Sequence, residues 1–221
     1  MTLSCFSKTS NGVQKIPVSA TMLRMKILIL ETSGEKSCII FTEGPRPIAW
    51  KELSGGPQLS KQLAQEVATL LGPLRPELIA VGTGPGSYTG IRVGAALAKT
   101  LAYGWQIPLI GFCSLKAFTP CLDGPFAILV DARMGGLYTL FGERKDTLLT
   151  FQTPSLQPLT LSFPASLPLA SPHPEVLKKK SSLPNPWIET KPDPTLLSAL
   201  IYQQYLDEGI HPLELTYLSS P

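Results

Sequence analysis

The feature that most constrains the fold is the glycine-dense segment 82–94, GTGPGSYTGIRVG, which lies between an apolar run and a helical pattern. The apolar run Leu78–Gly82 predicts a β-strand, and the residues from about Thr89 to Tyr103 predict a helix. A second apolar run, Leu109–Phe112, predicts another strand. Since two neighbouring strands joined through a helix run parallel, this part of the chain predicts an α/β protein with a partly parallel sheet.

The loop within this segment has two interpretations. Glycines before a helix allow backbone N–H groups to point outward, and the helix N-terminus carries partial positive charge. Gly84, Gly86 and Ser87 are therefore candidate contacts for a nucleotide or another anion. The loop lacks the Gly-Lys-Ser/Thr ending of a Walker motif and the glycine spacing of a dinucleotide fingerprint. The other interpretation is a tight turn in which glycine supplies a positive φ, and spacing alone leaves both open.

The helix that follows the loop has one face with almost no side-chain bulk. Gly90, Gly94, Ala98 and Ala102 recur at steps of four residues, which places them on the same side of the helix. Such a face allows another element to approach closely. Packing within the same domain and packing against another subunit both explain the spacing.

The remaining pattern predicts antiparallel hairpins that open a mixed sheet, twice along the chain. The predicted strands are Lys26–Leu30, Ser37–Thr42 and Ile48–Leu53 before the glycine segment, and Phe126–Val130 and Leu137–Phe141 after it. The predicted helices are Leu59–Leu71, a short stretch at Ser114–Phe118, and Pro194–Glu208. The chain between Pro154 and Pro194 is rich in proline, which predicts loops, because proline interrupts helices and central strands.

Composition argues against several classes of protein. Lys and Arg number 19 against 16 Asp and Glu, but three of the basic residues, Lys8, Lys15 and Arg24, lie in the acid-free segment 1–24, so the rest of the chain is neutral. A neutral body argues against binding nucleic acid unaided, because phosphate contacts rest on Lys and Arg. No apolar run has the length of a membrane-spanning helix, and the four cysteines form no CxxC pair. We therefore expect a cytoplasmic protein in which residues 1–24 are a disordered basic tail or lie upstream of the true start at Met25.

Few residues are suited to catalysis. The two histidines, His173 and His211, belong to no metal-binding motif, so no metal site is predicted. Ser87 lacks both the GxSxG frame and a neighbouring base that would make it a nucleophile. The sequence therefore predicts no catalytic residue.

Two acidic positions have alternative interpretations. Asp131 and Arg133 form either an acid with an anion clamp or, more commonly for such neighbours, a turn-stabilising pair in a structural loop. Glu31, followed by Thr32 and Ser33, lies in the first hairpin turn. It either holds a magnesium-bound water beside nucleotide phosphates or is a surface carboxylate.

Three segments resemble the TsaB (YeaZ) family of tRNA threonylcarbamoyladenosine biosynthesis proteins. They are residues 84–94, GPGSYTGIRVG; residues 130–135, VDARMG; and residues 26–33, KILILETS. The first motif is long and specific, and the resemblance covers roughly residues 25–141. Glu31 stands where the family usually has aspartate, which keeps the charge and moves it by one methylene.

The resemblance implies an actin-like fold of the sugar kinase and Hsp70 type. In that fold two related domains each contain a mixed sheet opened by antiparallel hairpins. Residues 25–113 are then expected to form a first, partner-binding domain. Residues 114–221 are expected to form a second, diverged and proline-rich domain.

The resemblance also implies a non-catalytic scaffold subunit that supports a catalytic TsaD-type subunit, with a TsaE-type ATPase as a further partner. Contact with tRNA is expected only through the complex, a homodimer is a further candidate, and no membrane contact is expected. ATP or ADP is expected at the complex interface and not on this chain alone. An alternative is a small-molecule kinase or ATPase of the same fold, which would turn over ATP by itself.

The family likeness favours the helical faces as the partner surface. The expected interface residues are Leu59, Leu63 and Val67 of the first long helix, and Gly90, Gly94, Ala98 and Ala102 of the second. On this expectation, Gly94→Leu leaves a folded chain that no longer binds TsaD.

Overall fold

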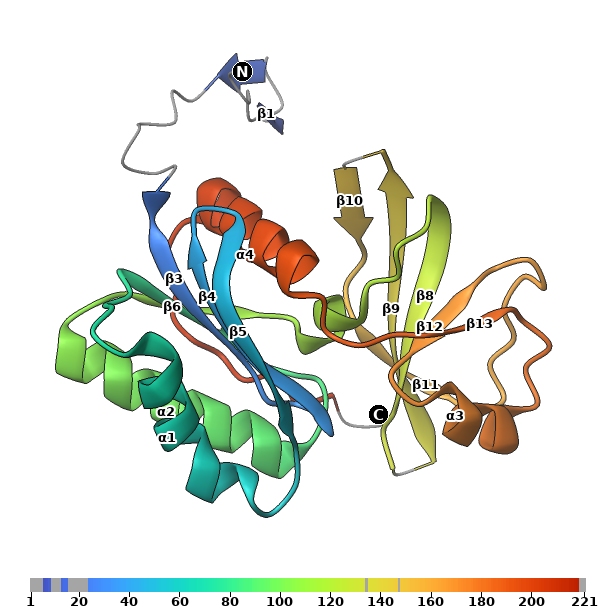
Figure 1. The fold of residues 1–221 in the computed structure, drawn as a ribbon. Helices are drawn as coiled ribbons and strands as arrows, with labels where there is room; N and C mark the ends of the chain where they lie inside the picture. Colours follow the sequence, from blue (N-terminus) through green and yellow to red (C-terminus); the bar gives the residue numbers. More distant parts are fainter. Residues whose placement is uncertain (1–5, 9–12, 16–23, 134, 147, 219–221) are drawn as a thin grey trace.

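Two mixed sheets, one in each of two lobes, organise the chain (Figure 1). The computed structural model describes residues 6–8, 13–15, 24–133, 135–146 and 148–218. The first lobe contains β3 (Lys26–Glu31), β4 (Lys36–Glu43), β5 (Arg46–Ser54), α1 (Leu59–Leu71), β6 (Leu78–Gly82), α2 (Tyr88–Trp105) and β7 (Leu109–Phe112). A 3-10 helix, η2 (Ser114–Phe118), leads to β8 (Gly124–Asp131), β9 (Gly136–Lys145), β10 (Leu148–Phe151), β11 (Ser155–Pro158), β12 (Leu169–Ser171), α3 (Pro174–Ser181), β13 (Trp187–Glu189) and α4 (Pro194–Glu208).

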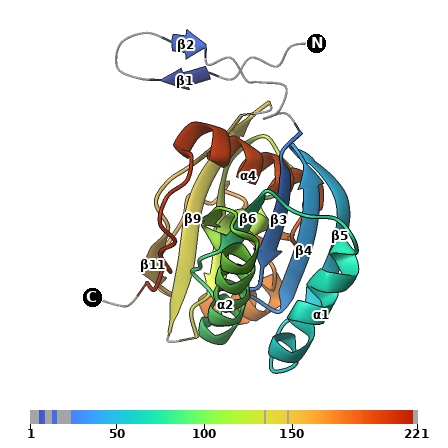
Figure 2. The ribbon, with the colours of Figure 1, turned by 90° about the vertical axis from the view of Figure 1, so that its left-hand side faces the viewer.

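The first sheet has the order β5-β4-β3-β6-β7. β3 pairs antiparallel with β4 and parallel with β6, so that Ile29 lies opposite Ile40 on one side and Ala80 on the other. Alternate β3 side chains face opposite sides of the sheet. Leu28 packs with α1 and α2, whereas Ile29 packs with α4. Helices on both faces explain why the central strands are continuously apolar (Figures 1 and 2).

The second sheet repeats the order of the first. Its strands run β10-β9-β8-β12-β13, and β11 also pairs with β9. In each sheet the first strand in chain order, β3 or β8, pairs antiparallel with one neighbour and parallel with the other. The predicted α/β fold with two hairpin-opened mixed sheets is confirmed.

The last helix packs on the first lobe, so the expected second domain, residues 114–221, does not include α4. Leu197 and Ile201 of α4 are buried against Ile27 and Ile29 of β3. The backbone N–H of Thr216 then donates to the carbonyl oxygen of Thr83, 2.8 Å away. The second domain is therefore an insertion in the described chain between two parts of the first lobe.

The proline-rich region is more ordered than predicted. It contains the strands β11, β12 and β13 and the helix α3, which begins at Pro174, where proline fits the first turn. Leu169, Ala170 and Leu177 are buried in the second lobe. The chain that was expected to be loop therefore contributes to this lobe's core.

The basic tail lies largely outside the described residues. Within it, β1 (Phe6–Lys8) and β2 (Val13–Lys15) pair antiparallel. The expectation that residues 1–24 are a disordered tail or an upstream start falls mostly outside the described residues and stays a prediction. Within the described part of the chain, the helices do not combine the length and the apolar content that crossing a membrane requires.

Candidate functional site

The glycine loop packs directly against the turn between β3 and β4. The backbone N–H of Ser87 donates to the carbonyl oxygen of Ser33 at 2.6 Å, and the Thr32 hydroxyl donates to the carbonyl oxygen of Gly90 at 2.9 Å. A Cβ on Gly90 would overlap the carbonyl oxygen of Thr32, and a Cβ on Gly86 would lie 2.5 Å from that of Ser33. These glycines thus permit the close approach of two backbone segments.

The helix start uses its own capping group. The Ser87 hydroxyl accepts from the backbone N–H of Gly90 at 3.3 Å, which satisfies one N–H group of the first turn of α2. Gly84 has a φ of 100°, and its N–H donates to the hydroxyl of Ser114 at 3.0 Å. Positive φ, helix capping and close packing therefore explain why glycine and serine occur at these positions of the loop. The predicted anion contact by Gly84, Gly86 and Ser87 stays a prediction.

Glu31 is enclosed by the same elements. Its side chain is 0% exposed, and its Oε1 accepts from the backbone N–H of Ser33 at 2.7 Å. Its Oε2 has no hydrogen-bond partner within the described residues, and a Cβ on Gly82 would overlap it. Burial raises the pKa of Glu31 above its ordinary value, although hydrogen bonds from Ser33 and Ser114 act in the opposite direction. The interpretation of Glu31 as a surface carboxylate is therefore wrong.

The small-residue stripe of α2 faces inward. A Cβ on Gly94 would overlap the hydroxyl oxygen of Thr32, and Ala98 is 0% exposed against the first sheet. All seven residues expected at the partner interface are buried in this lobe: Leu59, Leu63, Val67, Gly90, Gly94, Ala98 and Ala102. The assignment of these seven residues to a partner surface is therefore wrong, because they form the chain's own core.

The opposite sides of α1 and α2 carry exposed residues. The two helices contact each other and lie on the same face of the first sheet (Figure 2). We call the exposed side of this helix pair the α1–α2 face and define it by the exposed residues Ala64, Ala68, Thr89, Ala96 and Thr100. Its small side chains would let a partner helix approach closely. The sequence signal for this face is a set of alanines, Ala64 and Ala68 in α1 and Ala96 in α2, that lie outside the buried stripe of each helix.

Asp131 is the last residue of β8, and Arg133 lies in the turn that follows. The backbone N–H of Arg133 donates to Oδ1 of Asp131 at 2.8 Å, and the φ of Arg133 is 61°. Lys180 of α3 donates to Oδ2 of the same carboxylate. Burial raises the pKa of Asp131, but the hydrogen bonds from Lys180 and Arg133 outweigh it and lower the pKa below its ordinary value. These contacts are those of a structural turn that is tied to α3.

A cavity of about 510 Å³ lies beside β7, where the C-terminal segment passes the second lobe. Lys116, Gln204, His211 and Glu214 contribute polar groups to its lining, and Cys113 lies beside them. The sequence did not predict this cavity, because its walls come from segments far apart in the chain. Among the described residues, His, Cys, Asp and Glu side chains form no group of three that could hold a metal ion.

The chain is similar to a known protein family and to several known proteins. Residues 59–179, more than half of the chain, match the family model described as "TsaD: tRNA N6-adenosine threonylcarbamoyltransferase". A relative from Bacillus subtilis, described as tRNA threonylcarbamoyladenosine biosynthesis protein TsaB, is 43% identical over 74 residues. That match covers 32% of this chain and 32% of the relative.

The protein of the same description from Escherichia coli is 31% identical over 123 residues. The match covers 52% of this chain and 53% of the relative. The chain thus spans about a third to a half of the length of the curated relatives it matches.

Solved structures resemble the whole fold. YeaZ from Pseudomonas aeruginosa has a TM-score of 0.71 at 20% identity, over 86% of this chain and 100% of that one. A structure described as an uncharacterized protein with similarity to peptidase YeaZ, from the same organism, has a TM-score of 0.74 at 20% identity, over 88% and 100%. With the two hairpin-opened sheets, these likenesses show the actin-like two-domain fold. The chain belongs to the TsaB (YeaZ) family, and the TsaD family model also matches it.

Proposed function

We propose that this chain is a non-catalytic subunit of a tRNA threonylcarbamoyladenosine modification complex, in which it supports a catalytic TsaD-type subunit. The curated relatives from Bacillus subtilis and Escherichia coli are described as biosynthesis proteins of this modification, which supports the process. The observation that carries the scaffold role is the α1–α2 face, an exposed surface with small side chains on two adjacent helices.

The inward-facing sides of these helices support this assignment of the surface. Leu63 and Ala98 anchor α1 and α2 to the same sheet, so the two helices are held in one fixed arrangement. A partner that packs on Ala64, Ala68 and Ala96 would meet a preorganised surface, and little ordering would be needed on binding. A TsaE-type ATPase and tRNA would join through the assembled complex.

The proposal places ATP or ADP at the junction with the partner and not on this chain alone. Thr32, Ser33 and Ser87 hydrogen-bond within the chain, and Glu31 is enclosed. Titration of the isolated chain with Mg-ATP should therefore give no binding heat at micromolar concentrations. Binding together with ATP turnover by the isolated chain would instead favour a kinase or ATPase.

Substitutions on the α1–α2 face test the partner role. Ala68→Arg and Ala96→Arg add a long charged side chain at exposed positions, so each variant should keep its stability to within about 0.5 kcal/mol. Each should weaken binding to the TsaD-type protein of the same organism by about tenfold or more, since a bulky charge at the centre of an interface prevents close packing. Isothermal titration calorimetry measures the affinity, and thermal unfolding checks the fold.

The matched control lies on the other lobe. Val176→Arg adds the same side chain at an exposed position of α3 and should leave the affinity unchanged. Wild-type affinity in both α1–α2 variants would remove the face from the proposed interface. Failure of the wild-type chain itself to bind TsaD would contradict the proposed function.

A further inference from the structure

The two lobes meet around a small apolar joint. Ala117 of η2 is buried with the residues of the first sheet, whereas Leu115 and Phe118 are buried with those of the second. Two chain segments connect the lobes: residues 113–123, which include η2, and residues 190–193, which lead from β13 into α4. Contacts beside this joint are therefore placed where they could act on the relative orientation of the lobes.

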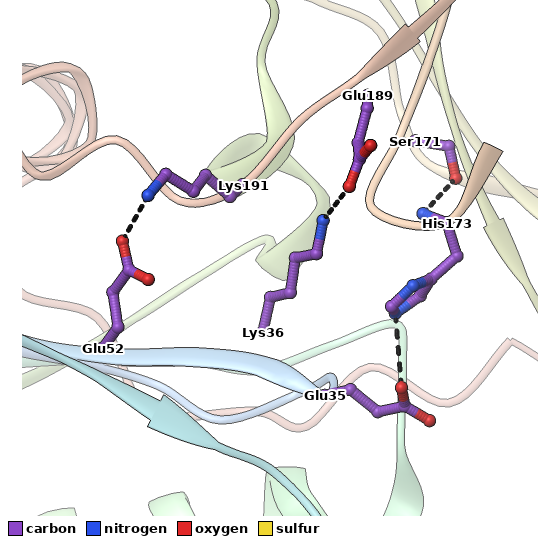
Figure 3. Close-up of polar contacts among 7 residues, drawn as sticks. All are labelled: Glu35, Lys36, Glu52, Ser171, His173, Glu189 and Lys191. Carbon is purple, nitrogen blue, oxygen red and sulfur yellow. Dashed lines mark hydrogen bonds and ion pairs between the residues drawn. The ribbon is translucent and has the colours of Figure 1, made fainter.

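Three side-chain contacts join the two lobes, and the sign of the charge on the first-lobe residue alternates from one contact to the next (Figure 3). Lys36 at the start of β4 lies 2.7 Å from Glu189 at the end of β13, and Glu52 of β5 lies 2.6 Å from Lys191. The third contact joins Glu35 to His173 at 3.6 Å and is an ion pair only when the imidazole is protonated.

The charges are complementary between the lobes. The first lobe presents Glu35, Lys36 and Glu52, and the second lobe with its connecting segment presents His173, Glu189 and Lys191. The hydrogen bond from Lys36 lowers the pKa of Glu189, and the hydrogen bond to Glu52 raises the pKa of Lys191. Glu189 and Lys191 therefore each meet a partner that favours their charged form.

We propose that the two Lys–Glu pairs form an electrostatic clasp that sets the relative orientation of the two lobes. The Lys191 pair acts on the connecting segment itself, and the Lys36 pair joins the tip of the β3–β4 hairpin to β13 of the second sheet. Glu189, Glu52 and Lys191 are exposed and Lys36 is partly exposed, so salt screens both pairs and leaves the buried apolar joint intact. The clasp thus gives a folded chain whose inter-lobe geometry depends on salt.

A distance measurement between the lobes tests the clasp. Spin labels replace exposed Lys99 on α2 and exposed Lys179 on α3, in a full-length background with Cys5, Cys113 and Cys121 changed to serine. Pulsed electron paramagnetic resonance then measures the distribution of distances between the two labels. We expect about 1 M salt, which shortens the Debye length to ~3 Å, to enlarge the population outside the main peak by about twofold to fivefold.

Charge exchange makes the test specific. Lys36→Glu and Glu189→Lys each place like charges opposite one another and should reproduce the effect of salt, whereas the double variant restores the pair and the wild-type distribution. Lys61→Glu on α1 makes the same change away from these contacts and should have no effect. Identical distributions for wild type at low and high salt would overturn the proposal, and this comparison needs no variant to fold.

Discussion

Glu31 is a carboxylic acid that the fold encloses completely, so its ionisation is coupled to folding. Burial raises its pKa in the folded chain above the value in the unfolded chain. The stabilising contribution of this residue is therefore fully present below the unfolded pKa of about 4.3 and is lost as the pH rises through the folded pKa. The neutral acid is the form that the folded state favours.

Glu31→Gln should remove this dependence on pH. The free energy of unfolding of the wild type should fall, relative to that of the variant, as the pH rises from about 4 through the folded pKa of Glu31. The fall is about 1.4 kcal/mol for every pH unit that separates the folded and unfolded pKa values. Urea unfolding of both proteins across this pH range measures it.

A control separates burial from the mere loss of a carboxylate. Glu43→Gln removes an exposed carboxylate from the end of β4 and should leave the pH dependence close to that of the wild type. If Glu31→Gln followed the same pH curve as the wild type, Glu31 would not be the buried acid described.

At the residue scale, local sequence identified Glu31 but not its environment. Its place in the first hairpin turn followed from the apolar runs on either side. The groups that surround it, Gly82 and Ser114, come from later segments that are brought together only by β6 and η2. A turn residue is ordinarily exposed, so sequence reasoning could not find this burial.

At the scale of one element, α2 presents two faces with different tasks. Gly94 faces Thr32, whose hydroxyl is already held by the carbonyl oxygen of Gly90 and cannot move away freely. Ala96 is exposed on the other side. The expectation that Gly94→Leu leaves a folded chain is therefore replaced by an expectation of lost stability.

Gly94→Ala should destabilise the chain by about 1–3 kcal/mol, because the overlap of its Cβ with Thr32 outweighs the better helix propensity of alanine. Chemical unfolding measures the difference. Gly104→Ala is the matched control: its Cβ would enter open space in the same helix, so it should stabilise by about 0.5–1 kcal/mol. A Gly94→Ala protein as stable as the wild type would show that the stripe is not tightly packed.

Elements with strong local periodicity were predictable. The spacing of Leu59, Leu63, Val67 and Leu71 fixed the bounds of α1, and the apolar runs fixed β6 and β7. β12 was not predictable, because a three-residue strand has too little alternation to recognise. It forms through parallel pairing with β8 and β13, which are distant in sequence.

At the scale of the whole molecule, two hairpin-opened sheets are joined by two connecting segments, and α4 returns to the first lobe. The two-domain order followed from the repeated strand pattern. The return of α4 could not be predicted, because its apolar side is equally suited to either sheet. Long-range ion pairs such as Lys36–Glu189 have no local sequence signal either.

The scaffold role is tested by the amount of threonylcarbamoyladenosine formed on tRNA. The reaction would contain the purified TsaD- and TsaE-type proteins of the same organism, the activated threonylcarbamoyl donor, ATP and tRNA, with or without this chain. The scaffold role predicts product only when this chain and TsaD are both present, and none from this chain alone. Equal product with and without this chain, or product from this chain without TsaD, would contradict the account.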